Sequence, residues 1–222
     1  MTRLLLGCGV VAGPFYVIVA LAQALTRERF DLTKHSWSLL ANGDLGWIQI
    51  TNFIATGMMV IAAAVGLHMT LRPKRGSIWG ALLLGGYGLG MIGAGIFRAD
   101  PAQGFPVGTP EVTAVSTHGL LHFVFGGVGF LCVIAACFVL ADRFVRDGRR
   151  DLAWFSRITG IVFLAGFVGI ASGSHGPTTV TFVAAILIVW SWLSTVSLHL
   201  YRHVAIKDRQ KCTDMSQRPR NS

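Results

Sequence analysis

The feature that most constrains this chain is a series of six apolar segments, each close to the roughly 20 residues that a helix needs to cross a bilayer. None contains an acidic residue, and they cover 4–25, 47–71, 78–98, 117–141, 152–172 and 179–203. Only 13% of the residues are charged, whereas a soluble domain carries about a quarter. The sequence therefore predicts an all-α, multi-pass membrane protein that folds as a bundle of six transmembrane helices.

The first apolar segment has a second interpretation. Arg3, an apolar run and the small residues of Ala22-Gln23-Ala24 are also typical of a cleaved signal peptide. The run is long for that role, and Gly13-Pro14 interrupts it. We expect the segment to remain as a span, and its cleavage would not invert the other helices.

Lysine and arginine gather at one end of the predicted helices. If the N-terminus is cytoplasmic, 14 of them lie on the cytoplasmic side, and the outer side holds four, Arg27, Arg29, Lys34 and Arg98. Cytoplasmic loops of membrane proteins are enriched in these residues, so both termini are predicted to be cytoplasmic, in the cell membrane. The short connections 72–77 and 142–151 then face the cytoplasm, and 26–46 and 99–116 face outward.

The net charge of +9 comes from short basic clusters between apolar runs. That distribution is typical of membrane topology signals and excludes a nucleic-acid-binding face, so membrane lipids are the expected partners. Residues 1–205 are expected to form one transmembrane domain, and 206–222 a basic, disordered cytoplasmic tail beside anionic headgroups. The four cysteines show no CxxC spacing, which favours neither a disulfide framework nor a zinc knuckle.

The third span is rich in glycine. Gly86 and Gly90 form a GxxxG pair, and Gly93 continues the same face. Small residues let membrane helices approach closely, so this pattern predicts tight packing. A passage lined by glycine backbone is the alternative.

Polar residues mark the outer ends of spans two to four. His118 and His122 are four residues apart and share one helix face, which Gly126 and Gly129 continue. Because lipid offers polar groups no partner, we expect this face to turn inward and meet a polar stripe of span two. That stripe consists of Gln49, Asn52 and Thr56.

Three charged residues stand beside these faces. Asp44 is placed to cap span two by accepting bonds from free amides. Asp100 is held extended by Pro101, and Arg98 can pair with Asp100, with Asp44 or with an anionic head of a ligand. Each residue also has a purely structural interpretation. Together they predict an outward-facing ligand pocket made of Asp44, Gln49, Asn52, Arg98, Asp100, His118 and His122.

Three stretches carry a family resemblance. They are HSWSLLANGDLGWIQ at 35–49, GAGIFRADP at 93–101 and HGLLH at 118–122. With them the chain, from about residue 5 to 203, resembles the bacterial membrane family known as domain of unknown function 998 (DUF998). The resemblance implies a six-helix membrane bundle and leaves activity, and whether the protein is an enzyme, open.

Three functions fit these residues. The first is binding of a lipid or small amphiphile in the outer pocket. The second is a zinc-dependent hydrolase at the outer leaflet, with His118, His122 and either His175 or His35 as ligands and Asp44 or Asp100 as ligand or base. The third is a b-type cytochrome with haem between His68 and His199. We favour the first, which needs no cofactor.

Overall fold

The computed structural model describes residues 1–71, 77–111, 113–173 and 176–217. These residues form six long helices and one short 3-10 helix, namely α1 (Thr2–Thr26), η1 (Trp37–Ala41), α2 (Gly46–Leu71), α3 (Ser77–Ile96), α4 (Thr117–Arg146), α5 (Arg150–Ala171) and α6 (Gly176–Gln217). Six helices in this part of the chain are long and apolar enough to cross a membrane. The predicted all-α fold with six spans is therefore confirmed.

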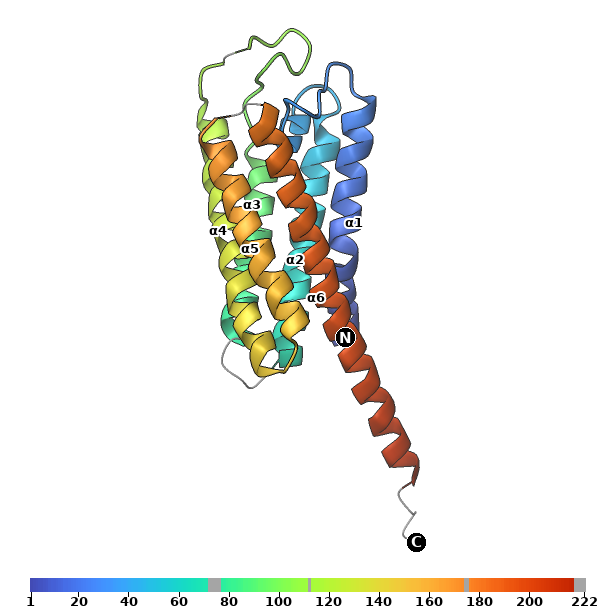
Figure 1. The fold of residues 1–222 in the computed structure, drawn as a ribbon. Coiled ribbons are helices and arrows are strands. Elements are labelled where there is room, and N and C mark those ends of the chain that lie inside the picture. The colour runs from blue at the N-terminus through green and yellow to red at the C-terminus, as the bar shows by residue number, and fades with distance from the viewer. Residues whose placement is uncertain (72–76, 112, 174–175, 218–222) are drawn as a thin grey trace.

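The helices form a closed ring. Each packs against its neighbours in sequence, and α1 also packs against α6 (Figure 1). The connections 27–45, 97–111 and 113–116 lie at one end of the ring, which we call the loop end, and the first and last described residues lie toward the other end (Figure 1). Which end faces the cytoplasm stays a prediction, and the basic connection 72–76 lies outside the described residues.

Glycine brings α3 close to both of its neighbours. A Cβ atom built on Gly90 would lie 2.7 Å from the Cα atom of Gly129 on α4, and one on Gly88 would lie 2.7 Å from the main-chain oxygen of Gly57 on α2. Such contacts leave no room for a side chain. Gly88 and Gly90 of α3 therefore serve the close helix packing that the sequence predicted.

The last helix is longer than the sequence analysis expected. α6 runs to Gln217 and leaves the bundle at its terminal end (Figure 1). The expected limit of the transmembrane domain at residue 205 lies within this helix, the tail from 206 stays a prediction, and residues 218–222 lie outside the described residues. The sequence between Pro177 and Pro219 contains neither glycine nor proline, so no residue interrupts the helix when its composition becomes polar.

Candidate functional site

All six helices line one cavity inside the ring. Its volume is about 580 Å³, within the range of small-molecule sites. The wall includes Tyr16 of α1, Phe53 of α2, Tyr87 of α3, Phe167 of α5 and Trp190 of α6, together with a long stretch of α4. Segments of both loop-end connections also contribute, so the cavity lies in the half of the ring nearest that end.

Aromatic rings form one wall of this cavity. The ring of Tyr16 lies 5.1 Å from that of Trp190 and 5.8 Å from that of Phe53, and Tyr87 lies 5.7 Å from Trp190, measured between centroids. These side chains are buried. Packed aromatic rings present a broad apolar surface, which suits a hydrocarbon chain.

Two glycines of α4 leave part of the wall without side chains. A Cβ atom built on Gly126 would meet no heavy atom within 4 Å, and one on Gly127 would meet only Phe167, at 3.6 Å. Both residues line the cavity. Of the two glycines expected on the inward face of this helix, Gly126 therefore leaves open space, and Gly129 packs closely against Gly90 of α3.

His122 lies in the cavity wall with its two ring nitrogens in different surroundings. Its Nδ1 is 2.9 Å from the main-chain oxygens of both Ala94 and Phe97. Carbonyl oxygens only accept hydrogen bonds, so Nδ1 carries a proton, and in the neutral form of the ring Nε2 then has a lone pair. Within the described part of the chain, Nε2 has no hydrogen-bond partner, and a ligand in the cavity can donate to it.

Asp100 also lines the cavity, at its loop end. Its carboxylate accepts a hydrogen bond from the amide of Ser116 at 2.8 Å and another from the Ser116 hydroxyl. A Cβ atom on Gly119 would overlap this carboxylate. Because glycine has no Cβ atom, the negative charge of Asp100 can lie against the first turn of α4. A helix N-terminus favours a negative charge, which fixes Asp100 near His122.

The other residues of the predicted site lie apart from the cavity wall. His118 is exposed and packs on the ring of Phe97, at 5.6 Å between centroids. Arg98 is exposed. Asp44 is exposed too, and its carboxylate makes no hydrogen bond to the described residues, so the expected cap of α2 is not formed. Partial burial lowers the pKa of Arg27, and the nearby negative charge of Asp44 opposes this shift.

The polar stripe of α2 faces α1 and not the histidine face of α4. Gln49 accepts a hydrogen bond from Gln23 at 2.9 Å, and Asn52 donates to the main-chain oxygen of Tyr16 at 3.1 Å. Asn52 also accepts from Thr56. The expected meeting of the two polar faces is therefore wrong, because the α2 groups find their partners within the α1–α2 interface, where they hold the two helices together.

His35 joins the two loop-end connections. Its Nδ1 accepts from the amide of Asp31 at 2.9 Å, so its Nε2 carries the proton that it donates to the main-chain oxygen of Gln103 at 3.0 Å. Hydrogen bonds from the hydroxyl and amide of Thr33 lower the pKa of Asp31. His35 thus holds together the two loop-end connections, which cover the cavity and which we call its roof.

The positions of the described residues do not provide structural support for the zinc or the haem hypothesis. In the segments that the structure covers, no group of three His, Cys, Asp or Glu side chains is placed to hold a metal ion. His175, one of the zinc ligands considered, falls outside them. His199, one of the haem ligands considered, takes part in a polar cluster. Both hypotheses stay untested.

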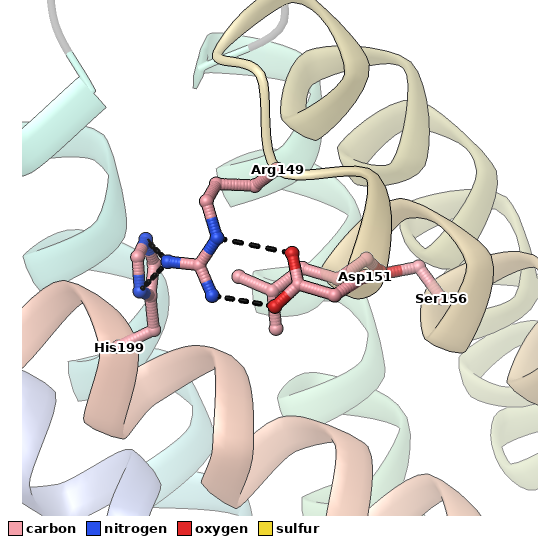
Figure 2. Close-up of polar contacts among 5 residues, drawn as sticks. Arg149, Asp151, Ser156 and His199 are labelled. Carbon is pink, nitrogen blue, oxygen red and sulfur yellow. Dashed lines mark hydrogen bonds and ion pairs between the residues drawn. The ribbon is translucent and has the colours of Figure 1, made fainter.

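That polar cluster lies near the terminal end of the ring. The guanidinium of Arg149 holds Asp151 through two hydrogen bonds, of 3.0 and 2.6 Å, and donates a third to Nδ1 of His199 at 2.8 Å (Figure 2). The carboxylate raises the pKa of Arg149. The cluster fastens the α4–α5 connection to α6, and its exposed ion pair adds little stability by itself.

The family assignment follows from comparison with known proteins. Residues 10–199 match the model of a family described as protein of unknown function (DUF998). The chain belongs to this family. No curated protein and no solved structure matches it. The family resemblance of the sequence is thereby confirmed, and as a DUF998 member with six span-like helices the chain is a multi-pass membrane protein.

Proposed function

We propose that this DUF998 protein binds an amphiphile, with its apolar chain in the cavity of the helix ring and its head at the loop end. The aromatic wall and the open space along α4 accept the chain. Asp100 and the lone pair of His122 Nε2 are hydrogen-bond acceptors beside the roof. The head is therefore one that donates hydrogen bonds, such as a hydroxyl or an amine.

The single observation that carries this proposal is the position of His122 in the wall of a largely apolar cavity, with an Nε2 that has no hydrogen-bond partner among the described residues. A donor group on the ligand can form a hydrogen bond with this nitrogen, which has no such bond to the described residues. Asp100, fixed by Ser116, adds negative charge on the same side. Of the seven residues that the sequence predicts to bind the ligand, the proposal therefore keeps Asp100 and His122. If the basic connections are cytoplasmic, this pocket faces outward.

The proposal is tested by filling the cavity. Gly126→Leu adds a side chain where a Cβ atom meets nothing within 4 Å, so the variant folds and occupies ligand space. Gly85→Leu is the matched control, since a Cβ atom there also meets nothing within 4 Å and Gly85 does not line the cavity. Lipids retained by the purified proteins are measured by native mass spectrometry.

We expect wild type and Gly85→Leu to retain an amphiphile and Gly126→Leu to lose most of it. Equal retention by all three proteins, each with an unchanged melting temperature, would show that retained lipid sits on the outer surface of the ring. The binding proposal would then be wrong.

A further inference from the structure

The seam between α4 and α5 is packed from the terminal end up to Gly127. Midway along α5, a Cβ atom on Gly160 would lie 3.0 Å from the ring of Phe138 on α4. Further along, Phe130 of α4 packs on Phe163 and on Phe167, at 5.2 and 5.3 Å between ring centroids. Gly127 then faces Phe167. Over this length the seam separates the cavity from the surroundings.

The packing stops one helical turn beyond Gly127. Phe123 lies on the same flank of α4 as Gly127 and Phe130, and it lines the cavity, yet 67% of it is exposed. A ring covered by α5 would be buried. α5 ends at Ala171, which is also both exposed and part of the cavity wall. Residues that face the cavity and the outside at once mark the rim of an opening.

We propose that this gap between the loop-end parts of α4 and α5 is a lateral opening, through which the acyl chain of a membrane lipid enters the cavity from the surrounding leaflet. The inference rests on the proposed function and names the source of its ligand. The rim residues Phe123 and Ala171, with Val115 at 72% exposure, are apolar. In a membrane such residues border hydrocarbon, so a chain passes between them without meeting water.

The alternative route, through the roof at the loop end, is poorly suited to an acyl chain. The groove on that side, of about 620 Å³, is lined by the charged residues Arg29, Asp31, Lys34 and Glu111. The hydrogen bond from His35 to Gln103 stands between this groove and the cavity. An apolar chain entering there would strip water from charged groups, which is unfavourable.

Tryptophan fluorescence reports entry of the chain directly. Trp37 and Trp190 line the cavity at 3% and 2% exposure, whereas Trp47, Trp79 and Trp154 are 61–65% exposed. Replacing the three exposed tryptophans by phenylalanine leaves only buried tryptophans as fluorescent reporters. The protein is reconstituted in phosphatidylcholine–phosphatidylglycerol vesicles and mixed rapidly with lysophosphatidylcholine brominated on its acyl chain. Quenching of the remaining fluorescence is followed in time.

Ala171→Phe places a ring at the rim, and Val168→Phe is its control because Val168 is 58% exposed on the same helix and does not line the cavity. We expect Ala171→Phe to slow quenching about fivefold or more and Val168→Phe to leave it unchanged. Phe123→Ala, which removes a ring from the rim, should speed quenching and provides the test if Ala171→Phe does not fold.

The two proposals fail in different ways. If all rim variants are quenched at the rate of the parent protein, to the same extent, the lateral opening is wrong and binding stands. If the parent protein is quenched no more than its Gly126→Leu derivative, no chain enters the cavity, and both proposals are overturned.

Discussion

His122 caps the end of α3 by donating from Nδ1 to the main-chain oxygen of Ala94, 2.9 Å away. The last carbonyls of a helix have no partner within it, and α3 ends at Ile96. One side chain of α4 therefore caps the neighbouring helix, and its second nitrogen takes no part in that cap. The structural role and the proposed binding role belong to different atoms of the ring and can be separated.

His122→Asn should separate them. The asparagine amide can donate to the carbonyls of Ala94 and Phe97, while the acceptor at the Nε2 position is lost. We expect a nearly unchanged melting temperature and binding of the retained amphiphile weakened about threefold to tenfold, the effect of one hydrogen bond.

His122→Phe should instead leave the Ala94 carbonyl buried without a donor. That costs about 1–3 kcal/mol of stability and lowers the melting temperature. Thermal unfolding in detergent compares the two variants. If asparagine and phenylalanine destabilise the protein equally, the cap assigned to Nδ1 is wrong.

Gly90→Leu should destabilise the ring strongly. A Cβ atom at this position would lie 2.7 Å from both the Cα atom of Gly129 and the main-chain oxygen of Phe125. Backbone cannot yield as a flexible side chain does, so α3 and α4 must separate. We expect a melting temperature well below that of Gly85→Leu on the same helix. A wild-type melting temperature for Gly90→Leu would contradict the close approach.

Acid should loosen the roof of the cavity at Asp31. Thr33 lowers the pKa of this carboxylate in the folded protein. A carboxylate with a depressed pKa contributes stability above its unfolded value, about 3.9, and loses it as pH falls through the folded pKa. The protection of residues 31–35 against hydrogen exchange, relative to the intrinsic rate at each pH, should therefore decrease below about pH 4. Asp31→Asn should exchange faster at neutral pH and lose this acid dependence.

The predicted orientation is tested by reporter fusions. Fusions after residues 148 and 210 should report the cytoplasm, and fusions after 34 and 108 the outside, because the basic connections favour the cytoplasmic side. The reversed pattern would place the cavity at the cytoplasmic leaflet and leave its geometry unchanged.

The spans could be predicted because each is continuous in sequence and apolar throughout. The helical spacing of His118 and His122 indicated a common face, and His122 does lie in the cavity wall. His118, one turn closer to the end of the helix, emerges beyond the packed region and is exposed. Helical periodicity predicts the direction in which a side chain points. It does not predict how far along the helix the neighbouring elements still cover that side chain.

The polar stripe of α2 shows a second limit. Spacing placed Gln49, Asn52 and Thr56 on one face, which they share in the structure. The helix that covers this face is decided by how the helices are arranged around the ring. The spacing of residues within α2 does not predict that arrangement. Gln23 on α1, a lone polar residue in an apolar span, was the available signal for the correct neighbour.

The aromatic wall of the cavity could not be predicted from the sequence. Tyr16, Tyr87 and Trp190 are separated by long stretches of chain, and each resembles an ordinary packing residue of an apolar span. Their common position arises only when the ring closes between α1 and α6. The open space at Gly126 was equally hidden, because glycine indicates close packing and open space alike.

The length of α6 turns a small motion into a large one. Its 42 residues extend for about 63 Å, roughly twice the hydrocarbon thickness of a bilayer. Trp190, in the cavity wall, lies near the first third of this rod, and Gln217 lies about 40 Å further along. A tilt of about 10° around Trp190 would carry the far end through about 7 Å. Any change of tilt in the part of α6 that borders the cavity would therefore be amplified at its far end.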